Sequence, residues 1–260
     1  AGATRLRVSG GEPLLEPGLL EVLSIATTLG FETIQLETNA VVASQPGVAE
    51  RLRQAGVSDA LVSVHGASSA AADPVYGRSG AHEASMEGAL ALQKAGVRLI
   101  ARTPLSADIL EELPHIPSAL HEAGLEIPTW WLRPLIRSPR STFDPSSMPP
   151  LTQLGAAIRD AGFAAREVGM SVEIDDELGL PLCLFAGDNQ SLRGLQRHPN
   201  RSRQDTHQKA AACTSCVASG DCPGQPIRYA DLHGPWEVTP FERIPQALVA
   251  RSSRPETYVI

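Results

Sequence analysis

Several features that would point to particular classes of protein are scarce or missing in this sequence. Aromatic residues are only 4% of its 260 residues, so the core volume must come mainly from Leu, Val, Ile and Ala. No apolar run approaches the roughly 18 residues that a membrane-spanning helix needs. No basic stretch followed by an apolar one opens the chain, as a secretory signal would. The net charge of −7 argues against nucleic-acid binding through bulk positive charge. We therefore expect a cytoplasmic protein with neither a nucleic acid nor a membrane as partner.

Cysteine is absent from the first two thirds of the chain. The four cysteines are Cys183, Cys213, Cys216 and Cys222. In a cytosolic protein, clustered cysteines more often bind a metal or a cluster than form disulfides. The remaining composition, 42% hydrophobic and 20% charged, is that of a folded globular protein. Its length allows one large α/β domain or a domain with an appendage.

Strand and helix patterns alternate along the first two thirds of the chain. The expected strands are 4–9, 32–37, 59–64, 97–102, 126–132 and 170–174. The expected helices are 14–29, 47–55, 81–95, 106–123 and 151–161. Such alternation predicts an α/β fold whose parallel strands are joined by right-handed crossovers. Polar and glycine residues follow the strands, and ligands bind at that edge of parallel sheets.

The chain also shows a change of character near its middle. Residues 134–150 are rich in Pro and Ser and are typical of a loop. We expect one domain over 1–150 and a second region over 151–260. Residues after Pro181 lack apolar periodicity, so that region needs another organiser, which a metal site can supply.

The turn after the first expected strand has the sequence Gly10-Gly11-Glu12-Pro13. Two glycines let the backbone turn sharply and approach a ligand closely. Glu12 then places a carboxylate at the strand-end face, where it is suited to a ligand ammonium. The alternative is an ordinary turn in which Glu12 sits at the start of a helix.

The cysteine spacing is Cys213-x2-Cys216-x5-Cys222, with Cys183 thirty residues upstream. Four thiolates suit tetrahedral zinc or a [4Fe–4S] cluster, and the spacing does not decide between them. On the residues alone zinc is favoured, because structural zinc sites with four thiolates are common.

Four segments together resemble one family. They are Val8-Ser9-Gly10-Gly11-Glu12-Pro13-Leu14-Leu15, Leu36-Glu37-Thr38-Asn39, Val62-Ser63-Val64-His65-Gly66, and Cys213-x2-Cys216-x5-Cys222. The chain resembles the radical S-adenosylmethionine (radical SAM) superfamily, and within it the enzymes with a C-terminal auxiliary-cluster domain of the SPASM or Twitch type. The resemblance runs over nearly the whole chain.

The resemblance implies an α/β fold of a particular kind: a partial (β/α)6 TIM-like barrel with an irregular, Cys-rich C-terminal region. Members of the family cleave S-adenosylmethionine reductively at a [4Fe–4S] cluster, and the 5′-deoxyadenosyl radical abstracts a substrate hydrogen. The residues that match the cofactor-binding positions are Gly10, Gly11, Glu12, Thr38, Asn39 and Ser63. Arg102 is a further candidate, for the methionine carboxylate, with a solvated strand end as the alternative. His65 could face the substrate or be a turn residue beside Gly66.

The sequence departs from the family pattern at one essential point. The defining Cys-x3-Cys-x2-Cys loop follows the family's first strand, and no cysteine precedes Cys183 here. The first strand–helix unit is therefore expected to be missing. We expect this chain to be a fragment of a longer enzyme, with a degenerate relative as the alternative. Activity is not expected without the missing loop.

The resemblance also changes the interpretation of the cysteines. It favours an auxiliary [4Fe–4S] cluster held by Cys183, Cys213, Cys216 and Cys222, with structure or electron transfer as its role. A second cluster and S-adenosylmethionine are expected in the full-length protein. The expected partners are a peptide, protein or small-molecule substrate and a reductant such as ferredoxin or flavodoxin. The alternative function is a non-catalytic iron–sulfur or zinc-binding scaffold derived from the same fold.

Overall fold

The structure is a computed structural model that describes residues 2–134, 147–175, 180–188, 191, 195–196, 207–234 and 239–245. Most of the expected Pro- and Ser-rich loop, at 135–146, lies outside the described residues. All candidate site residues lie within them. No helix in the described ranges has the length and apolar character needed to cross a membrane.

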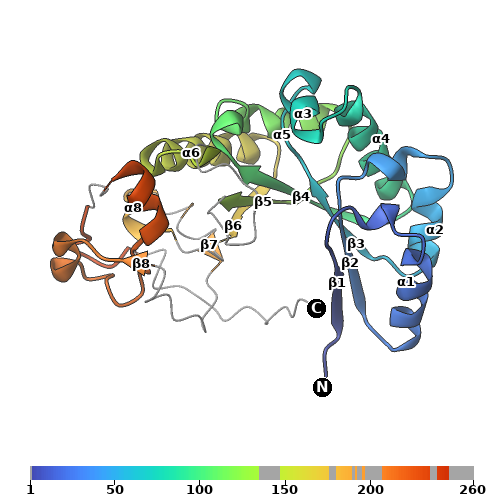
Figure 1. The fold of residues 1–260 in the computed structure, drawn as a ribbon, viewed down its shortest axis with the longest axis horizontal. Coiled ribbons are helices and arrows are strands. Elements are labelled where there is room, and N and C mark those ends of the chain that lie inside the picture. The colour runs from blue at the N-terminus through green and yellow to red at the C-terminus, as the bar shows by residue number, and fades with distance from the viewer. Residues whose placement is uncertain are drawn as a thin grey trace.

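A sheet of seven parallel strands runs through most of the molecule (Figure 1). The strands are β1 (Arg5–Val8), β2 (Thr33–Thr38), β3 (Asp59–Ser63), β4 (Arg98–Leu105), β5 (Thr129–Pro134), β6 (Ser171–Asp175) and β7 (Leu195–Gln196). Each strand pairs in parallel with the next one along the chain, so their order in space equals their order in sequence. The parallel α/β fold is thus confirmed for the first six strands. The two-residue strand β7 was not predicted.

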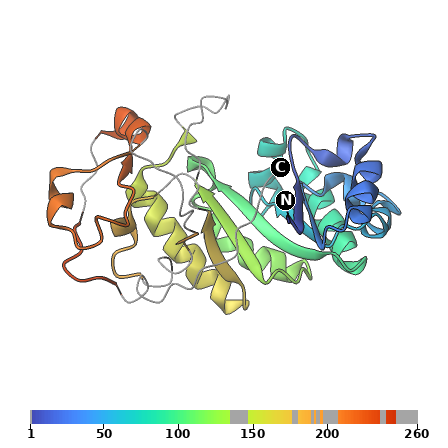
Figure 2. The same cartoon turned by 90° about the horizontal axis from the view of Figure 1, so that it is seen from below.

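The helices between the strands lie on one side of this sheet (Figures 1 and 2). They are α1 (Leu19–Thr28), α2 (Val48–Gln54), α3 (Ser69–Tyr76), α4 (Ala81–Lys94), α5 (Ile116–Glu122) and α6 (Leu151–Glu167). Right-handed crossovers between strands in sequential order always place the helices on the same face. The opposite, inner face of the sheet is left free of these helices.

Proline explains where the helix predictions were wrong. The expected helix 14–29 divides into a short 3-10 helix, η1 (Pro13–Leu15), and α1, because Pro17 cannot continue a helix interior. The expected helix 106–123 contains two 3-10 turns, η3 (Ala107–Ile109) and η4 (Leu113–His115), before α5 begins. Helix α3 was missed because Pro74 is a helix breaker in most contexts.

The main core lies between the sheet and the helices. Ile34, Leu36, Val62 and Leu99 point towards the helices from alternate strand positions and are buried. Trp130 is on the same side, fully buried, and its Nε1 donates a hydrogen bond to Thr103 Oγ1 at 2.9 Å. Leu, Ile, Val and Ala therefore make up most of this core, as the low aromatic content predicts.

The inner face of the sheet is polar and strongly curved. The Arg7 guanidinium carbon of β1 lies 5.2 Å from the centre of the Trp131 ring on β5. These strands are four places apart, a distance of about 19 Å measured along a sheet. Two side chains can bridge that distance only if the sheet bends towards its inner face.

The C-terminal part is built from short elements at the end of the molecule away from β1 (Figures 1 and 2). It contains η6 (Leu182–Phe185), η7 (Ala211–Ser215), the antiparallel pair β8 (His207–Gln208) and β9 (Gln225–Pro226), and α8 (Ile227–His233). The backbone N–H of Leu151 donates to the Tyr229 hydroxyl at 2.9 Å, and His233 Nε2 lies 2.9 Å from the Met148 carbonyl oxygen. Helix α8 is thereby fixed to the start of α6.

The division of the chain at residue 150 stays a prediction. Strands β6 and β7 follow that residue and extend the same sheet, beside β5.

Candidate functional site

The turn that follows β1 is open to a ligand. Gly10 has a φ of +149°, in the region that favours glycine. Gly10 and Gly11 are both exposed, and no other atom lies within 4 Å of the position that a Cβ would take at either residue. The backbone of this turn is therefore accessible at the carboxyl end of β1.

Glu12 is held by three donors from its own chain. Thr38 Oγ1 donates to Glu12 Oε1 at 2.6 Å, and the Asn39 backbone N–H donates to Oε2 at 2.8 Å. The Leu14 backbone N–H donates to Oε1 at 3.1 Å, so Glu12 also caps η1, as in the alternative interpretation. A carboxylate has about four acceptor positions, which leaves one for a ligand donor. Glu12 thus joins the turn after β1 to the end of β2.

Thr38, one of the expected cofactor-pocket residues, is buried next to Glu12. Its relative exposure is 2%, and its hydroxyl donates to Glu12 and accepts from the Ala40 backbone N–H at 3.0 Å. Thr38 is therefore a support for Glu12. Asn39 lies beside it, and its Oδ1 accepts a hydrogen bond from the Val41 backbone N–H at 3.0 Å. The Asn39 side chain shapes the turn that follows β2.

That turn is packed tightly against α4. Ala40 is fully buried and has a φ of +61°, a conformation that costs a non-glycine residue of the order of 1 kcal/mol. Gly88 of α4 lies so close that a Cβ there would be 2.9 Å from the Ala40 carbonyl carbon and 3.0 Å from the Ser44 backbone nitrogen. Helix α4 therefore fixes the backbone directly after Asn39.

Two further side chains connect the ends of β2 and β3. The Tyr76 hydroxyl lies 3.2 Å from the Ser63 carbonyl oxygen and 3.2 Å from Ser85 Oγ, and has one proton to share between them. Ser85 Oγ donates to the Asn39 carbonyl oxygen at 2.7 Å. Ser63 and Asn39 are therefore positioned through α3 and α4. Burial raises the pKa of Tyr76, which keeps this hydroxyl protonated.

Arg102 and Glu37 form an ion pair on the inner face. They belong to β4 and β2 and reach each other across β3. Their side chains are only 12% and 19% exposed, so Arg102 is not a solvated strand end. Within the described part of the chain, Arg102 Nε is buried without a hydrogen-bond partner. A buried donor of this kind favours an additional acceptor, such as a ligand carboxylate.

His65 is an uncharged neighbour of this ion pair. Burial, and then the charge of Arg102, lower the pKa of His65 to about 4. Its ring meets the Tyr76 ring edge-on, with the centroids 4.9 Å apart. His65 is thus a neutral imidazole near the strand ends at physiological pH.

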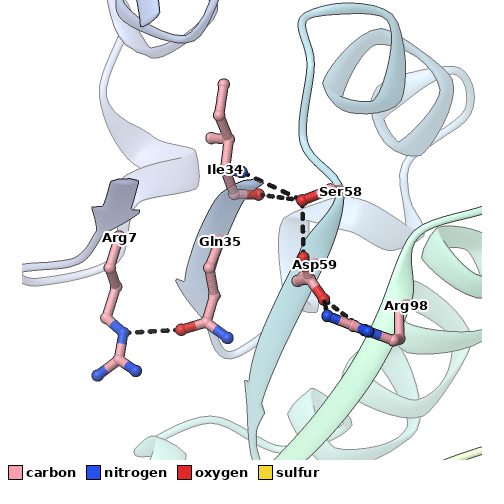
Figure 3. Close-up of polar contacts among 6 residues, drawn as sticks. All are labelled: Arg7, Ile34, Gln35, Ser58, Asp59 and Arg98. Atoms are coloured by element: carbon pink, nitrogen blue, oxygen red, sulfur yellow. Dashed lines mark hydrogen bonds and ion pairs between the residues drawn. The ribbon is translucent and has the colours of Figure 1, made fainter. Parts of the chain in front are cut away.

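A second polar layer lies near the amino ends of the strands (Figure 3). Arg7 Nε donates to Gln35 Oε1 at 2.7 Å, and Ser58 Oγ donates to Asp59 Oδ2 at 2.7 Å. Asp59 is buried and forms an ion pair with Arg98. Figure 3 shows that these side chains bridge neighbouring strands. Asp59 and Arg98 are the first residues of β3 and β4, away from the carboxyl ends of these strands, so we assign their ion pair to stability.

The four cysteines line a single cavity in the C-terminal part. The cavity is also lined by Leu182, Lys209, Ala218, Ser219, Pro240 and Phe241. The structure therefore brings together the four thiols that the sequence spreads over residues 183 to 222. All four are half-buried and free of disulfides.

Backbone amides point at the sulfur atoms of this cavity. The Leu182 N–H donates to Cys222 Sγ at 3.4 Å, and the Phe241 N–H donates to Cys216 Sγ at 3.3 Å. Hydrogen bonds of this kind stabilise thiolates and tune iron–sulfur clusters. The donor set therefore fits a group bound by thiolates.

Two of the thiols, those of Cys183 and Cys222, are costly to ionise without such a group. Burial raises the pKa of Cys183 to about 11 and also raises the pKa of Cys222. A bound cation would supply the positive charge that favours thiolates. Among the residues that the structure describes, no three His, Cys, Asp or Glu side chains come close enough to hold one metal ion. The sulfurs surround a space instead of converging on a point.

Several site residues were missed from the sequence. Tyr76, Ser85 and Gly88 lie on helices, with no local pattern that connects them to the strand ends. Glu37 and Lys209 are two charged residues that the sequence did not predict as site residues. Side chains alternate between the two faces of a strand, and this alternation places Glu37 and Arg102 on the same face as Ser63. It is the one sequence signal that could have indicated the ion pair between Glu37 and Arg102.

These features define a class: an α/β protein with a ligand-binding edge at the carboxyl ends of parallel strands and a separate four-cysteine cavity. Residues 1–108 match the family model described as Radical SAM superfamily. The match covers less than half of the 260 residues, and this part of the chain is similar to that superfamily.

Curated proteins are similar to less than half of this chain. An AdoMet-dependent heme synthase of Methanosarcina barkeri is 36% identical over 112 residues, which are 43% of this chain and 32% of that protein. A PqqA peptide cyclase of Gluconobacter oxydans is 25% identical over 123 residues, or 47% of this chain and 34% of the relative. The similarity thus spans about a third of the length of these curated relatives. The crystal structure of Streptococcus suis SuiB has a fold similar to that of this chain, with a TM-score of 0.52 and 13% sequence identity. The similarity covers 65% of this chain and 38% of SuiB.

Proposed function

We propose that this chain is part of a radical SAM enzyme that also carries an auxiliary [4Fe–4S] cluster. One observation carries the proposal: a chain whose first 108 residues match the family model of the superfamily also gathers four distant cysteines around one cavity. Bound S-adenosylmethionine would supply a 5′-deoxyadenosyl radical for hydrogen abstraction.

The proposed cofactor site is the open edge formed by the turn after β1 and the ends of β2, β3 and β4. Gly10 and Gly11 offer exposed backbone, and Glu12 has one acceptor position left for an ammonium group. Asn39 and Ser63 are fixed in place by α3 and α4, and Arg102 offers a buried donor for a carboxylate. No cysteine precedes Cys183, so the thiolates of a radical-generating cluster would have to come from outside this chain.

The sheet supports the proposed partial barrel. Its strands follow one another in sequence order, as they do in a (β/α) barrel, whereas doubly wound sheets reverse the order. The Arg7–Trp131 contact across the inner face requires the curvature that a barrel has. The inner face carries charged side chains in place of the apolar layers of a closed TIM barrel. We infer an open, polar interior.

The four-cysteine cavity favours a cluster over zinc. Tetrahedral zinc with Zn–S bonds of about 2.3 Å places its four sulfurs about 3.8 Å from one another. In the described residues no such convergence is present, and the sulfurs line a cavity with amides directed at two of them. With all four ligands from protein, the cluster would have no open iron for substrate, which supports electron transfer or structure as its role.

The proposed substrate is a peptide, a protein or a small molecule, and the proposed electron donor is a ferredoxin or flavodoxin. The names of the two curated relatives, a heme synthase and a peptide cyclase, support both substrate classes.

Metal analysis of the chain tests the cysteine site. After anaerobic reconstitution we expect about four iron and four sulfide per chain, brown protein, and no bound zinc. Cys183→Ser should lower iron and sulfide, because it removes one of four ligands. Ser215→Ala, in the neighbouring η7 turn, is the matched control and should load normally. Colourless protein with one zinc per chain would contradict the cluster.

Cofactor binding tests the strand-end site. We expect Arg102→Gln to weaken S-adenosylmethionine binding about tenfold in calorimetric titrations, as loss of one charged hydrogen bond predicts. Arg51→Gln, on the exposed side of α2, is the control. Equal affinity in both variants would remove Arg102 from the site.

The non-catalytic scaffold is the second candidate function, because Glu12 already accepts three hydrogen bonds from its own chain. Release of 5′-deoxyadenosine separates the two functions. The measurement uses the protein as the organism produces it, with S-adenosylmethionine and a reductant. Product formation supports the enzyme, and a loaded cluster with no product supports the scaffold.

A further inference from the structure

Lysine is rare in this chain, and one of its two lysines lies at the cysteine cavity. Of the 22 Lys and Arg residues, only Lys94 and Lys209 are lysines. Lys94 is in the last turn of α4, where it suits the helix C-terminus. Lys209 lines the cavity together with the four cysteines and is the one charged side chain among the ten lining residues.

The Lys209 ammonium is held in place by the segment that carries the cysteines. Lys209 Nζ donates to the Ser219 carbonyl oxygen and lies 3.3 Å from Ser219 Oγ. Ser219 is between Cys216 and Cys222 in the chain. The ammonium is therefore tied to the loop that joins two of the proposed ligands.

The backbone at Lys209 is also closely packed against this segment. Gly224, two residues after Cys222, has a φ of +88°. A Cβ at Gly224 would lie 3.0 Å from the Gln208 carbonyl carbon and 3.2 Å from Lys209 Cγ. The β8–β9 pair joins the same two segments through Gln208 and Gln225. Lys209 is thus fixed from both its backbone and its ammonium group.

The positively charged Lys209 side chain lies at the solvent-exposed edge of the cavity. The Lys209 side chain is exposed and lines the cavity together with the four cysteines. Among the described residues, three more charged side chains are close in sequence to the ligands or the lining: Asp221, Glu242 and Arg243. They are exposed as well and do not line the cavity. Lys209 therefore provides the positive charge nearest to the four thiols among the lining residues.

We propose that Lys209 raises the reduction potential of the cluster held by the four cysteines. The inference rests on the proposed auxiliary cluster. Reduction adds one electron, from a low-potential donor of the ferredoxin or flavodoxin class, to a site that is already negative through four thiolates, and no covalent bond forms or breaks. A fixed positive charge stabilises the reduced state more than the oxidised state. Lys209 is a positioning residue for charge, and the sulfur ligands remain the cysteines.

Potentiometry of charge variants tests this role. We compare the reconstituted chain with Lys209→Gln, which removes the charge, and with Lys209→Arg, which keeps it. Lys94→Gln is the matched control, because it removes the other lysine away from the cavity. Iron and sulfide content are measured first, and then the midpoint potential by dithionite titration with electron paramagnetic resonance detection.

We expect all four proteins to load equally. In Lys209→Gln the equilibrium constant for reduction should fall about tenfold, equal to a shift of about 59 mV to more negative potential for one electron. Lys209→Arg and Lys94→Gln should match the parent chain. Because Lys209 is exposed, the shift should shrink when the ionic strength rises from 0.01 M to 1 M.

The outcomes separate this inference from the proposed function. A loaded cluster with the same potential in Lys209→Gln and Lys94→Gln would overturn the role of Lys209 and leave the cluster proposal intact. A shift that Lys209→Arg shows equally would also overturn it, because charge would not be the cause. A parent chain that binds no iron and sulfide would overturn the cluster itself.

Discussion

The close approach of α4 to the turn after β2 gives the sharpest test of this structure. We consider Gly88→Ala. In a helix interior, replacing Gly by Ala normally stabilises the fold by about 1 kcal/mol, because it restricts the unfolded chain. At Gly88 the added methyl group would meet the Ala40 carbonyl group and the Ser44 backbone nitrogen. The sign of the effect therefore depends on whether these atoms can move away.

The atoms that the methyl group meets belong to backbone, and they are held in place. Ala40 is fully buried in a left-handed conformation, and its N–H is bound by Thr38 Oγ1. Overpacking of this kind costs about 1–3 kcal/mol, and rigid backbone places the cost near the upper limit. After the gain from helix propensity, we expect Gly88→Ala to lower the free energy of unfolding by about 2 kcal/mol.

Gly162 in α6 provides the matched control. It is also buried in a helix, but no atom lies within 4 Å of the position of an added Cβ. We expect Gly162→Ala to raise the free energy of unfolding by about 0.5–1 kcal/mol. Urea titrations followed by far-ultraviolet circular dichroism measure both variants. A Gly88→Ala protein as stable as Gly162→Ala would refute the close packing of α4 on Ala40. If that packing is right, Gly88→Ala should also weaken S-adenosylmethionine binding, because Asn39 precedes Ala40.

Two further predictions concern stability. The pKa of His65 is lowered from 6.5 to about 4 in the folded chain, so the unfolded chain binds the proton more readily, and stability is lost as pH falls from 6.5 to 4. Below pH 4 the full loss in the free energy of unfolding is about 3 kcal/mol. His65→Asn should flatten this part of the profile of stability against pH. His121→Asn, at an exposed position, is the control and should leave the profile unchanged. Tyr229→Phe removes the acceptor of the buried Leu151 N–H and should cost about 1–3 kcal/mol in urea titrations. An unchanged free energy of unfolding in Tyr229→Phe would mean that this hydrogen bond does not anchor α8 to α6.

The fold was largely predictable from local patterns. Alternating strand and helix segments, with glycine at the ends of helices such as Gly30 and Gly96, predict six parallel strands, whereas their order in the sheet comes from the structure. Prediction failed where proline has two roles: Pro17 separates η1 from α1, while Pro74 lies inside α3. Because proline can end a helix or lie inside one, its presence alone does not predict where a helix begins or ends.

The candidate site was predictable in its residue types and only in part in its geometry. The glycine turn and Glu12 follow a strand, so the sequence alone places them at a ligand-binding edge. It does not show that the Glu12 carboxylate is shared among Thr38, Asn39 and Leu14, because those contacts depend on how β1 and β2 pair. For the same reason the sequence does not show that Thr38 is buried and donates to Glu12.

The sequence by itself determined the parallel α/β fold and the presence of four thiols in a region without a large apolar core. Those properties follow from periodicity and composition, which act over a few residues at a time. Only the tertiary structure decided that Arg102 pairs with Glu37, that α4 fixes the turn at Ala40, and that Lys209 joins the cysteines at one cavity. These contacts join residues far apart in the chain, and they form because burial and pairing of charge select one arrangement of whole elements.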